Sequence, residues 1–264
     1  MRRTCAVVAL VFVMIGLGAS FVRPQLSVSA VDRALRALVL VDPVLARRLR
    51  ENHSAPLEAR LAARGFGLGD AAFIRIFKEE NQLEVWLRRE GSFTLFEAYP
   101  ICSWSGALGP KVREGDGQSP EGFYAVGLKQ LNPNSAYHRA FDLGFPNAYD
   151  RVHGRTGSYL MVHGDCLSVG CYAMRDGGID EIYRVVEAAL RAGQREVPVH
   201  AFPFRLSDEA LARRLQHPAA AEWAGLKEGY DLFEATKALP AVAVCGGRYS
   251  FGPPPADCTS VTAW

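Results

Sequence analysis

The stretch YLMVHGDCLSVGCYAM, Tyr159–Met174, carries one histidine and two cysteines within sixteen residues. The apolar run LMV before His163 predicts a strand that brings the imidazole to the rim of a sheet. Gly170 allows the backbone to turn sharply just before Cys171. This order of residues predicts that a thiol and an imidazole meet at the edge of a β-sheet.

A thiol beside an imidazole is suited to nucleophilic catalysis. A thiol near its ordinary pKa is mostly protonated at neutral pH, and an adjacent imidazole can take the proton to leave a reactive thiolate. The backbone N–H groups around the turn at 170–172 are placed to hold the oxyanion of a tetrahedral intermediate, and each such donor contributes roughly 3 to 4 kcal/mol in enzymes. The residues therefore predict acyl transfer.

Three other interpretations of the same stretch stay open. His163, Cys166, Cys171 and His153 could together bind zinc, although their spacing matches none of the common zinc motifs. A Cys166–Cys171 disulfide would disable the nucleophile, so it is compatible only with an oxidised resting form. The histidine and both cysteines could instead be buried small residues, but a histidine and two glycines are poor filler for a core strand.

The first twenty-three residues predict export. A basic head, Met1–Arg3, precedes nineteen uncharged residues, Thr4–Val22, and Gly18–Ser20 offers small residues to a signal peptidase. The same run is long enough to cross a bilayer as an uncleaved anchor. Residues 1–23 are therefore expected to be a signal peptide or an N-terminal anchor, with the protein in the periplasm and no other contact with a membrane.

The composition is that of a globular protein with a full core. The chain has 264 residues, 49% of them hydrophobic, which is ample for one domain with appended elements. A formal net charge of +2 gives no reason to expect nucleic acid as a partner. No metal or cofactor motif stands out, so neither a metal nor a cofactor is expected.

After residue 23 the sequence divides into three parts. Residues 24–70 place apolar residues at helical spacing and predict a helical prefix. Residues 71–204 alternate apolar and polar residues and predict the catalytic domain: a three-stranded meander, later strands over FYAVGL, SYLMVHG and VPVHAFPF, an irregular stretch at 131–150, and a helix over GIDEIYRVVEAALRAG. Residues 205–264 predict a helical extension that ends in a strand and a tail. The expected fold class is mostly β with flanking helices (α+β).

The pair His163–Gly164 followed by S-x-G-C at 168–171 resembles the YkuD-type L,D-transpeptidases, exported cysteine enzymes that act on peptidoglycan stem peptides. SPEGFY at 119–124 is similar to that family's (S/T)-P-x-G-x-(F/Y) motif. The short interval between histidine and cysteine, together with NPNSAYHRAFDLGFPNAYD and LKEGYDLFE, resembles the YafK-like branch. The resemblance covers roughly residues 73–233 and implies a YkuD-like β-sandwich or barrel.

The resemblance also assigns roles to catalytic residues. Cys171 corresponds to the nucleophile and His163 to the base that activates it. Ser168 occupies the family's Ser/Thr position and Gly170 the glycine next to the nucleophile. A catalytic imidazole needs an acceptor that orients it, and in this family that acceptor is often a backbone carbonyl.

Substrate contacts are less easily transferred. Many family members have histidine or lysine where this chain has Val169, and arginine or asparagine where it has Ala173. Because stem peptides present carboxylates, cationic and aromatic side chains are expected to shape the pocket. The candidates are Tyr137, His138, Arg151 and Arg155.

The number of cysteines agrees with one reactive thiol. Once Cys5 is removed with the signal, five cysteines remain in an oxidising compartment, so at least one is expected to be free. Cys171 is the natural candidate. The other four allow three pairings, of which we favour Cys245 with Cys258 and Cys102 with Cys166.

The expected reaction has two steps. Cys171 attacks the amide carbonyl at the L-centre of diaminopimelate in a stem peptide, an amine leaves, and an acceptor resolves the thioester. An amine of another stem would give a 3–3 crosslink, and a lysine of an outer-membrane lipoprotein would tether the envelope. Water as acceptor would make the enzyme an amidase that releases such links. A non-catalytic peptidoglycan-binding module is the alternative of another class.

Overall fold

The computed structural model describes residues 55–263. The predicted export segment at 1–23 and most of the predicted helical prefix lie outside these residues. The part of the prefix that is described contains helix α4 (Leu57–Ala63), which buries Leu57 and Leu61. Within residues 55–263, no helix has the length and hydropathy needed to cross a bilayer.

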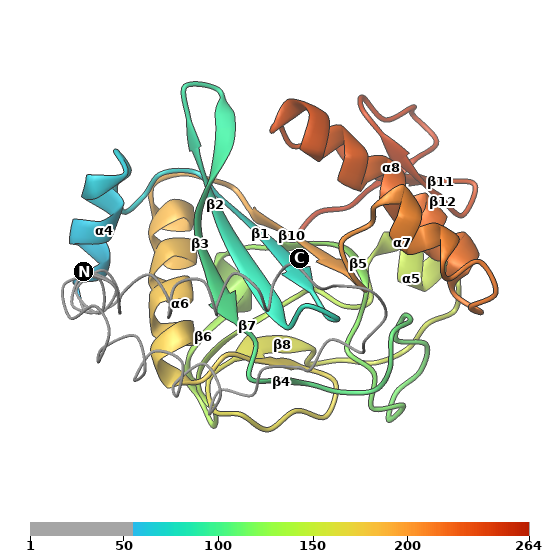
Figure 1. Ribbon diagram of the computed structural model, residues 1–264, viewed down its shortest axis with the longest axis horizontal. Coiled ribbons are helices and arrows are strands. Elements are labelled where there is room, and N and C mark those ends of the chain that lie inside the picture. Colours follow the sequence, from blue (N-terminus) through green and yellow to red (C-terminus); the bar gives the residue numbers. More distant parts are fainter. Residues whose placement is uncertain (1–54, 264) are drawn as a thin grey trace, which may run out of the picture. The chain divides into compact units, whose positions relative to one another are not determined.

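Two five-stranded sheets carry the fold of residues 55–263 (Figure 1). The first sheet has the order β3–β2–β1–β10–β5, and its strands are β1 (Ala72–Phe77), β2 (Gln82–Arg89), β3 (Ser92–Pro100), β5 (Gly122–Val126) and β10 (Val197–Phe202). The second has the order β4–β9–β8–β7–β6, and its strands are β4 (Ser103–Trp104), β6 (Leu131–Ser135), β7 (His138–Asp142), β8 (Met161–His163) and β9 (Tyr172–Ala173).

The predicted meander is confirmed as β1, β2 and β3, which pair antiparallel in sequence order. Strand β10 then joins β1 in parallel, with Ile74 opposite Val199. A parallel neighbour requires a crossover connection, and the chain between β1 and β10 includes the whole second sheet and helix α6. All six residues of β1 are buried, because both faces of the first sheet are covered.

The stretch at 131–150, expected to be irregular, contains the β6–β7 hairpin and the short helix α5 (Ala148–Val152). Pro133 in β6 obscures the strand pattern in the sequence. The structure accommodates it because β6 is an edge strand, where a residue without an N–H need not break the ladder. Strand β7 in turn pairs with β8 and so fixes the position of the catalytic segment.

The main core lies between the two sheets and helix α6 (Asp176–Arg191). Ile179, Ile182 and Val186 of α6 are buried together with Ile74 of the first sheet and Val162 of the second. The helix presents these apolar residues at helical spacing, as the sequence predicts. A mostly β fold with flanking helices is therefore confirmed.

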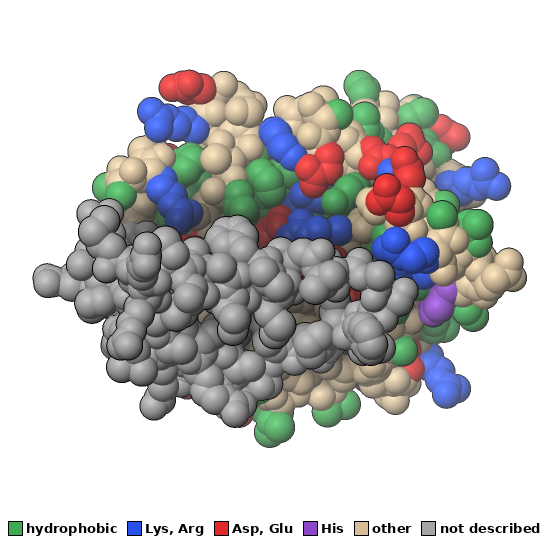
Figure 2. Space-filling model, in the orientation of Figure 1, with side chains coloured by type: hydrophobic (Ala, Val, Ile, Leu, Met, Phe, Trp, Pro, Cys, Tyr) green, Lys and Arg blue, Asp and Glu red, His purple; other side chains and the backbone are tan. Residues whose placement is uncertain are grey.

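The C-terminal extension contains α7 (Asp208–Ala212), α8 (Ala220–Thr236) and a three-stranded sheet, β12–β11–β13. The strands of this sheet, where the sequence predicts one strand and a tail, are β11 (Val242–Cys245), β12 (Arg248–Phe251) and β13 (Thr259–Ser260). Trp223 of α8 is fully buried in a cluster with Phe77 and Phe123 of the first sheet. Side chains of both charges lie close together over α8 (Figure 2), where Lys227 pairs with Asp208 and Asp231.

Buried charged groups also tie the extension to the first sheet. Lys78 and Glu121 form an ion pair of 2.9 Å from which solvent is fully excluded. The indole of Trp223 donates to the same carboxylate at 2.8 Å. Arg75 pairs with Glu234 of α8 at 2.6 Å. The extension is therefore an integral part of the folded domain.

Candidate active site

The predicted catalytic segment lies on two adjacent parallel strands, β8 and β9, with Val162 opposite Tyr172 and His163 opposite Ala173. Side chains alternate between the two faces of a strand. Val162 and Tyr172 are buried in the main core, so His163 points to the opposite face. Cys171, two residues before Ala173, lies on the same face as His163. The structure thus brings the predicted nucleophile and base to one face of the second sheet.

The Cys171 thiol is free and half-buried. Its Sγ accepts a hydrogen bond from the Met161 N–H at 3.4 Å, and the S–H faces the Tyr159 carbonyl at 3.5 Å. Burial raises the pKa of the thiol, and the Met161 N–H opposes that rise. The carboxylate of Asp142 acts in the same direction as burial, whereas Lys111 lowers the thiol pKa. The resting sulfur is therefore protonated at neutral pH.

The His163 ring is buried and held in one tautomer. Its Nδ1 lies 2.6 Å from the Gly164 carbonyl oxygen. Because a carbonyl only accepts, Nδ1 carries the hydrogen and Nε2 is the basic nitrogen of the neutral ring. Burial lowers the pKa of the imidazole, and the Gly164 carbonyl partly opposes this. The ring of Tyr137 packs against it, with centroids 4.8 Å apart. No hydrogen bond joins the ring to Sγ in the described residues.

Gly164 fits a space that no other residue could occupy without a shift. A Cβ at this position would lie 2.7 Å from the carbonyl oxygen of Tyr137 and 2.7 Å from a carboxylate oxygen of Asp176. The Gly164 N–H donates to the carbonyls of Tyr137 and Arg139. The histidine-glycine pair is therefore fixed by the close approach of the turn before β7.

Three serine hydroxyls hold the backbone at the nucleophile. Ser168 and Ser119 both donate to the Cys171 carbonyl, at 2.7 Å and 2.9 Å. Ser105 accepts from the Gly170 N–H and lies 3.2 Å from the Ser168 oxygen. Since the hydrogen of Ser168 is already donated, Ser105 is the donor in that contact. Ser168 thus holds the backbone of Cys171, the predicted nucleophile.

The turn at Gly170 determines which backbone donor is left for an oxyanion. Gly170 has φ +109°, a left-handed conformation that favours glycine. Its N–H is taken by Ser105, so it is not available to a substrate. In residues 55–263, the Cys171 N–H makes no hydrogen bond outside the strand ladders. The oxyanion donor predicted from the turn is therefore best assigned to Cys171 itself.

Both favoured disulfides are present, Cys102–Cys166 and Cys245–Cys258. The bond from Cys166 to Cys102 is incompatible with a Cys166–Cys171 disulfide and removes Cys166 from any zinc site. It also ties the turn before the nucleophile to the residue that precedes β4. No group of three or more potential metal ligands gathers anywhere in the described part of the chain.

Comparison with known proteins identifies the family of this chain. Residues 72–200 match the YkuD family, the L,D-transpeptidase catalytic domain. YafK of Escherichia coli K12, which is named provisionally as an L,D-transpeptidase, is 49% identical over 187 residues, 71% of this chain and 76% of YafK. The chain belongs to the YkuD L,D-transpeptidase family. The resemblance drawn from the sequence, including its YafK-like character, is confirmed.

Solved structures of lower similarity also match this YkuD-family chain. The helical cell shape determining protein Pgp2 of Campylobacter jejuni is 21% identical, with a TM-score of 0.41, over 68% of this chain and 64% of Pgp2. Bd1075 of Bdellovibrio bacteriovorus is 15% identical, with a TM-score of 0.37, over 73% of this chain and 91% of Bd1075.

Two of the four predicted substrate-binding residues lie at the start of β7, Tyr137 in the turn before the strand and His138 as its first residue. Tyr137 is half exposed and packs on the His163 imidazole, so it borders the candidate site. His138 has φ +71° and its Nε2 lies 2.9 Å from Asp180 of α6. The turn thus presents one aromatic ring to the site and anchors the neighbouring histidine on the helix.

The two predicted arginines lie on and just after α5, which in Figure 1 is next to the C-terminal extension and well separated from β8. Arg155 is buried and pairs with Asp150 and with Glu222 of α8. Arg151 donates to the Pro146 carbonyl. The Arg155 guanidinium is therefore occupied by partners within the chain, and a substrate role for either arginine remains a prediction.

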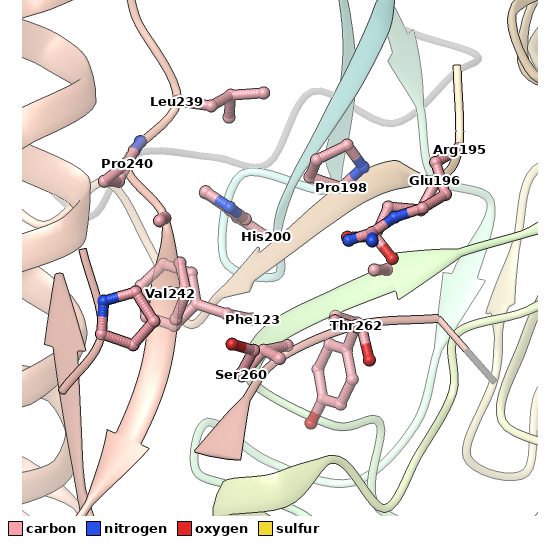
Figure 3. A pocket seen from close by; sticks show the side chains of 15 residues that line it. Phe123, Arg195, Glu196, Pro198, His200, Leu239, Pro240, Val242, Ser260 and Thr262 are labelled. Atoms are coloured by element: carbon pink, nitrogen blue, oxygen red, sulfur yellow. The ribbon is translucent and has the colours of Figure 1, made fainter. Parts of the chain in front are cut away.

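A hollow of about 190 Å³ lies elsewhere in the molecule (Figure 3). It is lined by residues of β5, β10 and the C-terminal strands, among them Phe123, His200 and Val242. Neither Cys171 nor His163 lines it. It is thus distinct from the catalytic face.

Sequence reasoning did not identify Ser105, Ser119, Lys111 and Asp142 as site residues. The first three belong to the loop at 103–122, whose unusual length in a compact domain was the available signal, because such loops are often functional. Asp142 gave no local signal. It reaches the catalytic face only through the pairing of β7 with β8.

Proposed function

We propose that this protein is an exported cysteine acyl transferase that acts on diaminopimelate-containing peptidoglycan stem peptides in the periplasm. The observation that carries the proposal is the free Cys171 thiol on the same sheet face as His163, whose tautomer leaves Nε2 as a base. Membership of the L,D-transpeptidase family supports the substrate class.

The proposed first step begins from a neutral pair. Burial raises the pKa of the Cys171 thiol and lowers the pKa of His163, so both groups are uncharged at neutral pH. As Sγ attacks the amide carbonyl, its proton passes to Nε2 of His163. The Cys171 N–H stabilises the oxyanion that forms on the former carbonyl oxygen.

Collapse of the tetrahedral intermediate breaks the C–N bond. The imidazolium returns its proton to the leaving amine, and the acyl group remains on Sγ as a thioester. An incoming amine then attacks the thioester carbonyl and loses a proton to Nε2, while Sγ leaves as the thiol. The acceptor is proposed to be an amine of a second stem peptide or a lysine of an outer-membrane lipoprotein.

Hydrolysis by the same residues is the second candidate function. It is favoured by the exposure of the rim beside the nucleophile, where Tyr159 is 75%, Leu167 69% and Val169 86% exposed. A thioester that water can reach is hydrolysed unless an acceptor excludes the water. With water as acceptor, the enzyme would release crosslinks or lipoprotein from peptidoglycan.

Mass spectrometry of muropeptides incubated with the purified protein tests the proposal. The wild type should convert muropeptides whose diaminopimelate carries an amide at the L-centre carbonyl, with or without lipoprotein attached, whereas Cys171→Ala should leave them unchanged. His163→Gln should be strongly impaired, and Glu79→Gln, which alters an exposed ion pair, should match the wild type. Products of equal amount from the wild type and Cys171→Ala would refute the nucleophile. New crosslinks or shortened products distinguish transfer from hydrolysis.

A further inference from the structure

Asp142 differs from the other buried carboxylates of residues 55–263 because it has no cationic partner. The other buried acidic residues each have a cationic partner: Glu84 pairs with Arg205, Glu121 with Lys78, and Asp150 with Arg155. No cationic side chain in the described part of the chain forms an ion pair with Asp142. A buried carboxylate without a cation is costly unless something else compensates its charge.

Groups of the protein compensate only part of the negative charge of the Asp142 carboxylate. One oxygen of Asp142 accepts from the Gly144 N–H at 2.8 Å, and the other, which solvent can reach, has no donor among the described residues. Burial raises the pKa of the carboxyl, and the Gly144 N–H only partly opposes the rise. Lys111, the nearby cation that acts on the thiol, is already bound to Asp116 at 2.7 Å. The second oxygen is therefore free to accept a cation from a ligand.

The sheet register places this oxygen on the catalytic face. Asp142 in β7 is opposite Met161 in β8, whose N–H donates to Sγ of Cys171. Their neighbours Phe141 and Val162 are opposite each other and point into the core. Asp142, Met161 and Cys171 thus form one row on the side of the sheet that faces away from the main core. Two strand spacings separate Asp142 from Cys171, about 10 Å between their Cα atoms.

We propose that Asp142 binds the ammonium group at the D-centre of the diaminopimelate whose L-centre carbonyl is attacked by Cys171. The inference rests on the proposed function and adds a residue that selects the substrate. The ammonium nitrogen is six bonds from the reactive carbonyl carbon, roughly 7 Å along an extended chain. With the carbonyl at Sγ and the chain lying along the row, the ammonium group reaches the free oxygen of Asp142.

An ion pair between Asp142 and the D-centre ammonium group would give the enzyme a preference among donor stems that the nucleophile cannot provide. A D-centre amine that is already acylated, as in a stem used as acceptor in a crosslink, carries no charge and would leave the carboxylate uncompensated. Partners left unpaired in a buried site discriminate strongly between substrates. Donor stems with a free D-centre amine are therefore the expected substrates.

The test compares two synthetic stem-peptide donors, identical except that the D-centre amine is free in one and acetylated in the other. Purified full-length wild type should have at least a tenfold higher kcat/KM for the free amine, mainly through KM. Asp142→Asn should lose this preference, so that its kcat/KM values for the two donors become equal. Asp142→Glu, which keeps the charge, should retain part of the preference.

Covalent adduct formation with a carbapenem checks that the nucleophile is intact, because this reagent has no diaminopimelate ammonium group. Asp142→Asn should form the adduct, and Glu79→Gln should behave as the wild type with both donors. Equal use of both donors by the wild type overturns the inference, as does an equal loss on both donors in Asp142→Asn. No turnover of either donor by the wild type refutes the proposed function, and the inference with it.

Discussion

Ser119 donates its hydroxyl hydrogen to the carbonyl oxygen of Cys171 at 2.9 Å, across 52 positions of sequence. Ser119 is fully buried and lies three residues before the start of strand β5. The contact links the long loop at 103–122 to the nucleophile. Together with Ser168, it fixes the peptide plane between Cys171 and Tyr172, on the C-terminal side of the predicted nucleophile.

Replacing Ser119 with alanine should lower kcat with little effect on KM. The variant loses one of two hydrogen bonds to the Cys171 carbonyl, and removing a buried hydrogen-bond partner typically costs about 1–3 kcal/mol. The steady-state kinetics of a stem-peptide donor measure the effect, and Ser92→Ala at an exposed position is the matched control. Unchanged kcat in a folded Ser119→Ala protein would show that Ser168 alone positions the nucleophile.

The pH dependence of acylation should show that Cys171 and His163 are both uncharged in the resting enzyme. The pKa of His163 is lowered by burial, so the base stays unprotonated to a lower pH than an ordinary histidine, whose pKa is about 6.5. The rate of carbapenem acylation should therefore persist below that pH and then fall as His163 gains a proton. His163→Gln should lack this acidic limb.

The rate of alkylation by iodoacetamide reports the protonation state of the Cys171 thiol. Burial raises the pKa of Cys171, so the rate should still be rising with pH above about 8.5, the ordinary thiol value. A rate already at its plateau at pH 7 would indicate a preformed thiolate and would contradict the neutral pair.

Removing the disulfide near the site should affect both stability and acylation. The double variant Cys102→Ser, Cys166→Ser opens a loop with a sequence separation of 64, and a disulfide of this kind typically stabilises by about 2–4 kcal/mol. Urea unfolding measures the stability and carbapenem acylation measures the site. The matched control is Cys245→Ser, Cys258→Ser, which should reduce stability without slowing acylation. Equal acylation rates in both double variants would mean that the first disulfide does not order the turn before Cys171.

The buried ion pair under α8 should be essential for stability. In Glu121→Gln the Lys78 ammonium would keep its burial and lose its counter-charge, and breaking such a pair typically costs about 3–5 kcal/mol. Denaturant unfolding provides the measurement. The control Asp231→Asn removes an exposed pair with Lys227, which should cost less than about 1 kcal/mol. Similar losses in both variants would show that burial adds nothing to the Lys78 pair.

Much of the fold was predictable because its signals are local. The meander of β1 to β3, the helix α6 and the strand β10 follow from apolar periodicity over a few residues. The β6–β7 hairpin was not predicted, because Pro133 interrupts the pattern and an edge strand tolerates it. The three-stranded C-terminal sheet was not predicted either, since its strands have only two to four residues.

By itself, the sequence determined the candidate chemistry of this protein, through a Cys171 that follows a glycine and lies close in the chain to His163, five cysteines after residue 23, and the motifs of its family. Only the tertiary structure decided which residues surround that chemistry. Ser105, Ser119 and Asp142 are 66, 52 and 29 positions before Cys171. Arg155, which is closer to Cys171 in sequence, instead pairs with Glu222 of α8. Strand order and register bring such residues together, because hydrogen bonding between strands depends on the packing of the whole core rather than on local pattern.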